Sequence, residues 1–376
     1  MAIDGRDEKN WHDEIKMIIA GGGTGGHLFP GLAIGKEIAE RYERSEIVFI
    51  TGLRKIEAEI IERSGFKQES INIEGLKGRG WKGGLRALTR IPLGLYNSVR
   101  IIKRMSPNIV LGVGGYSSGP ACLAAKLLGV PTAVHEQNSY PGLTNRLLCR
   151  FVDRVFISFE ESRKYFSGGS IYLTGNPVRR ELIESVRDHV SSEGSFTILV
   201  MGGSQGARAI NKAFIASLEI LTRRGKEPLV IHQTGERDIK DVLNDYKLKG
   251  LKGEVYPFIQ DMAATYQKAD IVVNRAGATT ISELAALGKP SILIPYPYAT
   301  NRHQDTNAQI LAGSGGAVVL AQDGLTGESL ADILMKYMDD RKALLRMGKQ
   351  ARKVGRPEAV RVIADEIENM AFRTEN

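Results

Sequence analysis

The residue best suited to chemistry is His27, which directly follows a loop of five glycines and one threonine, residues 21–26. The apolar run 17–20 precedes this loop, and a helical pattern resumes at Leu32. Glycines let a backbone approach a ligand closely, and the helix start that follows offers unpaired amides to an anion. The imidazole of His27 could transfer a proton near neutral pH, or it could simply pack against the loop.

Three more polar groups follow predicted strands. His135-Glu136-Gln137-Asn138 ends one strand, and Arg179 follows Asn176-Pro177 near the middle of the chain. We expect the residues 135–138 to line a cleft because a core tolerates few polar side chains, although pairing within the fold would also explain them. Glu283 lies one turn inside a helix that Thr279 begins, where it could hold a ribose or cap that helix.

Strand-like and helical patterns alternate almost to the end of the chain, which predicts an α/β protein. The sequence of strand, glycine loop and helix occurs at 17–38 and restarts at 196–209. We therefore expect two doubly wound, Rossmann-like parallel-sheet domains, at 16–177 and 178–357, after a polar extension over 1–15. The expected strands are 17–20, 47–52, 71–73, 109–113, 131–134, 155–158, 171–173, 196–201, 229–232, 254–258, 271–273 and 291–294.

Composition describes an ordinary globular protein, with 42% hydrophobic and 25% charged residues among 376. No apolar run reaches the ~18 residues of a membrane span. The charged N-terminal residues argue against a secretory signal. Cys122 and Cys149 form no C-x-x-C pair and are expected to be core residues in a reducing cytoplasm. No cluster of histidine, cysteine and carboxylates has metal-ligand spacing, so no metal held by the protein is expected.

The sequence fits two common nucleotide-binding motifs poorly. Gly21, Gly23 and Gly26 match the G-x-G-x-x-G of dinucleotide enzymes, which also need an acid at the end of the second strand. That strand ends in Thr51-Gly52. The chain also lacks the G-x-x-x-x-G-K-[ST] loop of P-loop ATPases.

The net charge of +8 is concentrated between Gly75 and Met105, where eight basic residues occur without an acid. Apolar side chains and a tryptophan lie among these charges, which favours binding to anionic lipid headgroups. A solvated helix face or RNA binding would be the alternatives, but no nucleic-acid motif is present. The expected membrane-facing residues are Leu76, Lys77, Arg79, Trp81, Lys82, Leu85 and Arg86.

Six ordered motifs resemble the MurG family of bacterial glycosyltransferases over about residues 16 to the mid-300s. The glycine loops 21–27, 114–120 and 202–207 are similar to those of the family, and so are segments 135–138, 175–179 and 276–283. The resemblance implies the GT-B architecture, in which two Rossmann-like domains face each other across a cleft. It also implies that the last helix, 358–372, returns to the N-terminal domain.

The resemblance implies transfer of N-acetylglucosamine (GlcNAc) from UDP-GlcNAc to the muramyl hydroxyl of lipid I, giving lipid II and UDP in peptidoglycan synthesis. Glu283 should hold the ribose and Ser204 the diphosphate, with further residues around the nucleotide sugar. Those further residues are Thr24, Gly25, Gly26, Asn138, Arg179, Ile259, Ala278, Thr279 and Gln304. Gly23, Gly115, Tyr116 and Ser117 would form acceptor or phosphate loops, whereas the role of His303 is in doubt.

The implied reaction is an inverting displacement without a cofactor, in which amides, Arg179 and a helix dipole stabilise the leaving diphosphate. A base must take the hydroxyl proton: His27 is the first choice, with Glu136 and His135 as the others. The implied location is the cytoplasmic face of the plasma membrane, with lipid I and other cell-wall and division proteins as partners. A UDP-GlcNAc 2-epimerase or a membrane assembly factor that only binds the nucleotide sugar are the alternative functions.

Overall fold

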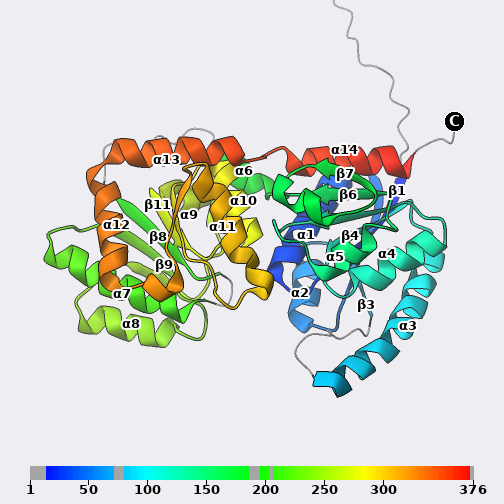
Figure 1. The fold of residues 1–376 in the computed structure, drawn as a ribbon, viewed down its shortest axis with the longest axis horizontal. Helices are drawn as coiled ribbons and strands as arrows, with labels where there is room; N and C mark the ends of the chain where they lie inside the picture. Colours follow the sequence, from blue (N-terminus) through cyan, green and yellow to red (C-terminus); the bar gives the residue numbers. More distant parts are fainter. Residues whose placement is uncertain (1–13, 72–79, 186–194, 204–205, 373–376) are drawn as a thin grey trace, which may run out of the picture.

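The computed structural model describes residues 14–71, 80–185, 195–203 and 206–372, with only the backbone for 80–91 and 185. Its strands form two parallel sheets with helices on both faces (Figure 1), which confirms the predicted α/β fold class. The first sheet has the order β3-β2-β1-β4-β5-β6-β7 and the second the order β10-β9-β8-β11-β12-β13. We call each sheet with its covering helices the N-terminal and the C-terminal unit.

The strands of the N-terminal unit are β1 (Glu14–Gly21), β2 (Arg44–Thr51), β3 (Lys67–Ser70), β4 (Ile109–Gly114), β5 (Thr132–Glu136), β6 (Arg154–Ile157) and β7 (Ser170–Leu173). Those of the C-terminal unit are β8 (Thr197–Met201), β9 (Leu229–Gln233), β10 (Glu254–Tyr256), β11 (Ile271–Asn274), β12 (Ser291–Leu293) and β13 (Ala317–Val319).

The helices follow in chain order: α1 (Gly25–Arg41), α2 (Lys55–Arg63), α3 (Gly80–Met105), α4 (Ser118–Leu127), α5 (Leu143–Leu148), α6 (Arg180–Ser185), α7 (Arg208–Arg223), α8 (Ile239–Leu248), α9 (Met262–Lys268), α10 (Ala278–Leu287), α11 (His303–Gly313), α12 (Gly327–Asp339), α13 (Arg341–Val354) and α14 (Ala359–Ala371). Short 3₁₀ turns cover Glu160–Tyr165, Thr300–Arg302 and Gln322–Gly324.

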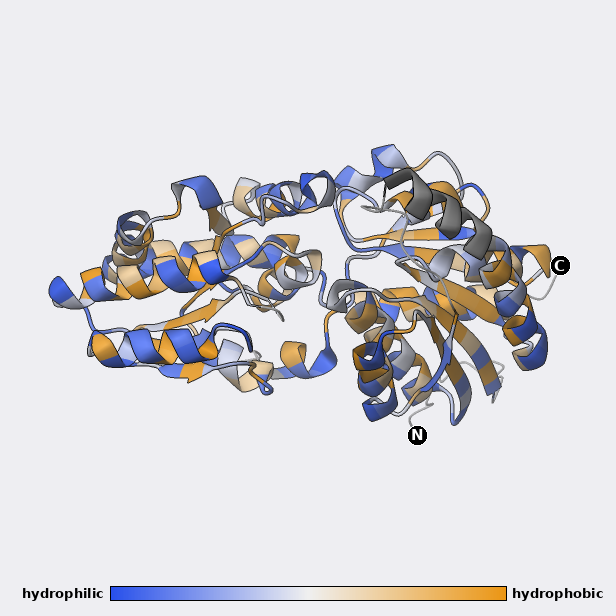
Figure 2. Ribbon diagram, turned by 90° about the horizontal axis from the view of Figure 1, so that it is seen from below, coloured by the Kyte–Doolittle hydropathy of each residue, from blue (hydrophilic) through white to orange (hydrophobic). Residues whose placement is uncertain are grey.

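The central strands are hydrophobic on both faces because helices cover both sides of each sheet, as the largely orange strands of Figure 2 show. In β1, Met17 and Ile19 pack on the face covered by α1 and α14, whereas Ile18 and Ala20 pack on the opposite face. This alternation is the two-residue period of a strand. The strand order places β1 and its glycine loop beside β4, the middle strand of the sheet.

The last helix, α14, packs on the N-terminal unit although it follows the C-terminal unit in sequence (Figure 1). Ile363 and Ile367 are fully buried in the same core as Met17 and Ile19. Arg154 of β6 ion-pairs with the carboxylate of Glu366 and donates to its carbonyl oxygen at 3.0 Å. Hydrophobic burial and a buried ion pair therefore both hold this helix on the first sheet.

Three strand expectations need correction or addition. The third strand, β3, lies at Lys67–Ser70 and not at Ile71, and the rest of the strand expected at 71–73 lies outside the described residues. β3 is a polar edge strand without the apolar run that marks a buried strand. β13 is three residues long and was not expected. β1 begins at Glu14, which pairs with Arg44, so residues 14 and 15 do not belong to the expected extension. The domain limits at 177/178 and 357/358 stay predictions.

The described residues contain no helix that is both long and apolar enough to cross a membrane.

We expect Ile367→Ala to lower the free energy of unfolding of the N-terminal unit by about 2–5 kcal/mol, because it leaves a cavity in a fully buried contact. Urea unfolding of the full chain would measure the shift. Asn369→Ala, on the exposed side of the same helix, is the matched control and should change stability by less than about 0.5 kcal/mol. Equal effects of the two substitutions would contradict the docking of α14 described here.

Candidate active site

The candidate site lies where the strand order of each sheet reverses direction. In the first sheet this point lies between β1 and β4, and in the second between β8 and β11. Ligands of doubly wound proteins bind at such points, outside the carboxyl ends of the strands. The three glycine loops and the segment before α10 all follow these four strands, so the sequence motifs converge on the two switch points.

The first two glycine loops interlock through their backbones. The amide of Gly22 donates to the carbonyl oxygen of Gly114 at 3.3 Å. A Cβ on Gly115, whose φ is +84°, would lie 2.3 Å from the carbonyl oxygen of Gly22. A Cβ on Gly114 would lie 2.8 Å from Nδ1 of His27. Glycine is therefore required at both positions for steric reasons as well as for backbone conformation.

A buried glutamate of α2 fixes the first loop. Oε1 of Glu57, a residue 4% exposed, accepts from the amide of Gly23 at 2.8 Å, and Arg54 donates to the carbonyl of Gly23. The other oxygen, Oε2, is buried without a partner among the described residues. With the Gly23 amide occupied, the amides of the loop that have no partner among the described residues are those of Thr24, Gly25 and Gly26, at the start of α1. Sequence reasoning missed Glu57, since nothing distinguishes it from other helical acids.

His27 is connected to the end of β5 by a chain of side-chain hydrogen bonds. Its Nδ1 lies 2.8 Å from Oε1 of Gln137, and Nε2 of Gln137 lies 3.0 Å from Nδ1 of His135. Nε2 of His135 in turn lies 3.1 Å from the carbonyl oxygen of Gly175. Burial lowers the pKa of His135 to about 4, so this histidine is neutral at physiological pH. His27 is half-buried, whereas His135 and Gln137 are buried.

The carboxylate of Glu136 is occupied by the loop that follows it. One oxygen accepts from the backbone and side chain of Asn138 at 2.9 and 3.2 Å. The other accepts from the amide of Gly142 at 3.0 Å and from Asn145 at 2.9 Å. With four donors and 1% exposure, Glu136 is arranged to hold this loop in place.

The start of α10 forms the opposite wall of the site. The N-cap residue of α10 is Gly277, so no side chain bonds the first amides of this helix. The buried hydroxyl of Thr279 has no partner among the described residues. Glu283, one turn further, accepts from the Tyr266 hydroxyl at 3.2 Å and lies 3.6 Å from Arg179. A helix start with free amides, an orphan hydroxyl and a cation suits a phosphorylated ligand.

Arg179 also reaches the N-terminal unit, since its guanidinium lies 5.9 Å from the ring centre of Phe29 in α1. Burial raises the pKa of the Glu283 carboxyl above its ordinary value, and the charge of Arg179 counters part of this rise. The arginine therefore connects the wall that carries His27 with the wall that carries Glu283.

A second part of the C-terminal unit is tied together by Gln233. Its Oε1 accepts from the amide of Ile259 at 2.8 Å, and its Nε2 donates to the carbonyl of Gly203 at 3.2 Å. The third glycine loop and Ile259 are thus neighbours. Ser204 lies outside the described residues.

The two units are joined beside the site by the carboxamide of Asn307 in α11, which is fully buried. Its oxygen accepts from the backbone and the hydroxyl of Ser139 at 3.0 and 2.9 Å. Its nitrogen donates to Asn138 at 3.3 Å and to the carbonyl of Ala276 at 3.4 Å. Gln304, in the first turn of the same helix, accepts from the amide of Tyr296 at 2.9 Å. Asn307 is a further residue that sequence reasoning missed.

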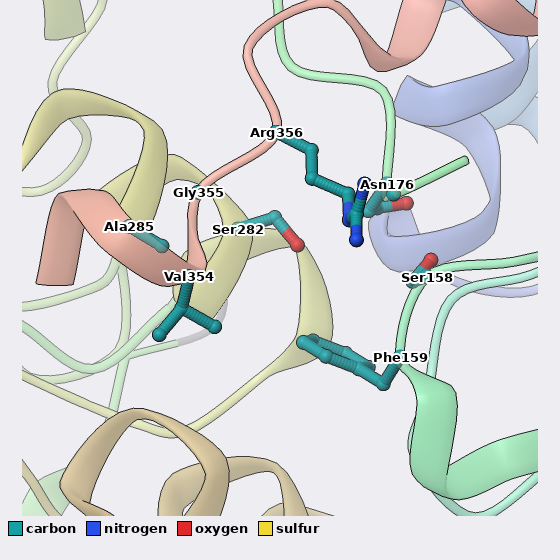
Figure 3. A pocket seen from close by; sticks show the side chains of 9 residues that line it. Ser158, Phe159, Asn176, Ser282, Ala285, Val354, Gly355 and Arg356 are labelled. Carbon is teal, nitrogen blue, oxygen red and sulfur yellow. The ribbon is translucent and has the colours of Figure 1, made fainter. Parts of the chain in front are cut away.

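A small pocket lies between the segment Ser158–Asn176 of the N-terminal unit and α10 with the end of α13 (Figure 3). Asn176 and Arg356 point toward each other in it, and Ser158 and Ser282 lie on opposite sides. Both polar side-chain atoms of Asn176 are buried without a partner among the described residues. Gly175 packs closely on Arg356, because a Cβ there would lie 2.7 Å from Cβ of Arg356.

The structure therefore brings most of the expected site residues to the two switch points, and the remaining ones lie as follows. Tyr116, in the second loop, is 45% exposed, whereas Ser117 is buried. Ala278 is buried at the start of α10, and Thr24 is exposed before α1. His303 bonds the carbonyl of Thr300 at 2.7 Å. The membrane-facing set lies outside the described residues (Leu76, Lys77 and Arg79) or in the part of α3 with undescribed side chains (Trp81, Lys82, Leu85 and Arg86).

Within the described part of the chain, no group of three or more histidine, cysteine or acidic residues could hold a metal ion.

Comparisons with known proteins agree with this geometry. Residues 17–157 match the glycosyltransferase family 28 N-terminal domain, and residues 197–365 match the C-terminal domain of that family. A UDP-N-acetylglucosamine--N-acetylmuramyl-(pentapeptide) pyrophosphoryl-undecaprenol N-acetylglucosamine transferase of Myxococcus xanthus is 45% identical over 96% of this chain and 94% of its own. The Geobacter sulfurreducens protein of the same name is 42% identical over 94% and 98%.

Solved structures agree with these relatives. The crystal structure of Acinetobacter baumannii MurG matches with a TM-score of 0.77 and 30% identity, covering 94% of this chain and 99% of its own. A UDP-GlcNAc 2-epimerase from Neisseria meningitidis, bound to UDP-GlcNAc, shares the fold with a TM-score of 0.67 and 14% identity over 94% and 98% of the two chains. At that identity the likeness concerns the fold alone. On the strength of near-full-length identity above 40% and both domain matches, the chain belongs to the MurG family of glycosyltransferase family 28.

Proposed function

We propose that this protein transfers GlcNAc from UDP-GlcNAc to the muramyl hydroxyl of lipid I, forming lipid II and UDP. The observation that carries the proposal is the near-full-length identity to transferases of that name, together with His27 and Glu283 on opposite walls of one site. The epimerase alternative is not favoured, because that enzyme shares only the fold, at 14% identity.

The C-terminal unit binds the donor in this proposal. Glu283 holds the ribose hydroxyls, and the α10 start with Ala278 and Thr279 receives the diphosphate together with Ser204 and Arg179. Ile259 lies at the nucleotide and Gln304 at the sugar. The orphan hydroxyl of Thr279 supports this assignment, since a diphosphate oxygen would satisfy it.

The N-terminal unit provides the base and the acceptor site. Thr24, Gly25, Gly26 and Asn138 lie over the sugar, while Gly23, Gly115, Tyr116 and Ser117 shape the acceptor loops. His27 is the base in preference to Glu136 and His135, because the oxygens of Glu136 already accept four hydrogen bonds and His135 is fully buried.

The reaction is a single inverting displacement. The acceptor hydroxyl attacks the anomeric carbon of GlcNAc while its proton passes to Nε2 of His27, and the bond from that carbon to the UDP oxygen breaks. The leaving diphosphate gains negative charge, which the α10 amides and Arg179 stabilise. The chemistry requires no redox cofactor.

The acceptor is lipid-linked, so the protein must act at a membrane surface. We place it at the cytoplasmic face of the plasma membrane, attached peripherally through the basic segment 75–105 and near other cell-wall and division proteins. Support comes from the described C-terminal part of α3, where Leu93 and Tyr96 are 48% and 60% exposed beside Arg100 and Lys103.

We expect purified protein with labelled UDP-GlcNAc and a lipid I analogue to yield a labelled disaccharide-lipid and UDP.

His27→Ala should lower kcat by about 10²–10⁴, the usual contribution of a general base, with little change in UDP affinity. His303→Ala is the matched control, because that half-buried histidine bonds only a local carbonyl. UDP-GlcNAc turnover by the folded protein without any acceptor would instead support the epimerase.

We expect Glu283→Ala to weaken UDP binding about 10- to 100-fold, as loss of charged hydrogen bonds to a ribose would. UDP affinity of the unmodified chain should fall as pH drops through the raised pKa of Glu283, because protonation removes the acceptor charge, and Glu283→Ala should abolish this dependence. Titration calorimetry with UDP measures both. Asp241→Ala, at an exposed carboxylate of α8, is the control, and an equal loss there would contradict the assignment.

Neutralising Lys77, Lys82, Arg86 and Arg90 together should weaken binding to anionic vesicles by about 10³-fold, at roughly 1 kcal/mol per charge. Sedimentation with phosphatidylglycerol vesicles at low and high salt would measure this loss. The matched control neutralises four exposed basic residues of α13: Lys342, Arg346, Lys349 and Lys353. Binding that ignores salt, or an equal loss in the control, would refute the membrane role of the segment.

A further inference from the structure

The chain of hydrogen bonds behind His27 has a fixed direction, because it touches backbone carbonyls that can only accept. Nε2 of Gln137 lies 3.0 Å from the carbonyl oxygen of Val113 and 3.2 Å from that of His135. The nitrogen of the Gln137 carboxamide must face these oxygens. Its own oxygen therefore faces His27, at 2.8 Å from Nδ1.

The hydrogen bonds of His135, at the other end of this series, run in the same direction from donor to acceptor. Nε2 of His135 faces the carbonyl oxygen of Gly175 at 3.1 Å, so this nitrogen carries the proton. In a neutral ring the other nitrogen is then an acceptor, and Nδ1 of His135 accepts from Gln137 at 3.0 Å. Burial keeps the ring neutral by lowering its pKa to about 4. The two N–H groups of Gln137 face three acceptors, so one N–H group is shared between two of them, and all three acceptors still require the nitrogen on that side.

We propose that Gln137 and His135 are positioning residues that hold neutral His27 as the tautomer protonated at Nδ1 and leave Nε2 as the basic nitrogen. The oxygen of Gln137 can only accept, so Nδ1 of His27 must donate to it. Nε2 has no hydrogen-bond partner among the described residues. A base with the other tautomer would present a proton to the acceptor hydroxyl and could not accept one.

This inference rests on the proposed function for its catalytic meaning, but the tautomer itself can be observed without substrate. The arrangement does for His27 what a carboxylate does for the histidine of a Ser-His-Asp triad, with one difference. A neutral amide orients the ring without adding negative charge beside it. The carboxylate next to it in sequence, Glu136, bonds the 138–145 loop instead.

The test is ¹⁵N NMR of the full chain with labelled histidine at alkaline pH, where the imidazole is neutral. Protonated and unprotonated ring nitrogens differ widely in ¹⁵N shift, and loss of signals in His27→Gln assigns the ring. We expect His27 to be protonated at Nδ1 in the unmodified protein. Protonation at Nε2 would overturn the proposal, and this measurement needs no variant that might fail to fold.

Substitution of Gln137 separates positioning from packing. Gln137→Met fills the same volume without an acceptor, so His27 should lose the Nδ1-protonated form and kcat should fall about 10- to 100-fold with KM for UDP-GlcNAc changed less than about twofold. An unchanged His27 tautomer in Gln137→Met would overturn the proposal.

The matched control is Glu136→Gln, one residue earlier in the same buried segment. This substitution disturbs the hydrogen bonds of Glu136 to its loop, so it should lower the free energy of unfolding. His27 should nevertheless keep its tautomer, because Glu136 is not part of the hydrogen-bond series from His27 to His135. The signals of His232, which bonds Tyr246 and Asn211 in the C-terminal unit, provide an internal reference.

If the tautomer is found but no transfer occurs, the proposed function fails and the inferred geometry stands. If transfer occurs with His27 protonated at Nε2, the inferred geometry fails and the proposed function stands.

Discussion

The site depends on the close approach of two backbones, those of the loops after β1 and β4. The Gly22 amide bonds the Gly114 carbonyl at 3.3 Å, and neither loop has room for a Cβ at the contact. Because adjacent parallel strands end at the same sheet edge, this contact brings the start of α1 directly over β4. The imidazole of His27 then lies against bare Gly114, within reach of the polar side chains at the end of β5. Bulk at Gly114 or Gly115 would separate the histidine from these side chains before any ligand was bound.

The C-terminal unit repeats the sheet architecture of the N-terminal unit, but different chemical groups lie at its switch point. Its switch point pairs a glycine loop with the start of α10, where free amides, the Thr279 hydroxyl and Glu283 gather. The N-terminal switch point instead has part of its amide surface occupied by Glu57 and Gly114. Two similar folds therefore present different groups: free amides and an unpartnered hydroxyl in the C-terminal unit, and the imidazole of His27 in the N-terminal unit. Arg179, which lies at both walls, is the residue through which they interact electrostatically.

Sequence patterns predicted the fold class and most strands, because buried parallel strands are continuous apolar runs and glycine loops mark their ends. The resemblance to the MurG family was likewise confirmed. The polar edge strand β3 and the three-residue β13 carry no such signal and were missed or misplaced. Glu57, Gln233 and Asn307 could not be identified, since each acts through a partner distant in sequence. The direction of the Gln137 bonds depends on which carbonyls surround it, which only the folded chain determines.

Asn307 has a consequence for how the two units separate. Its carboxamide makes four hydrogen bonds: the oxygen accepts two from Ser139, and the nitrogen donates to Asn138 and to the carbonyl of Ala276. Three of the four cross between the units, because Ser139 and Asn138 lie in the N-terminal unit and Ala276 lies in the C-terminal unit. Separation of the units at this point breaks these three bonds, at about 0.5–1.5 kcal/mol each. Because one carboxamide makes all three, these contacts between the units depend on a single side chain.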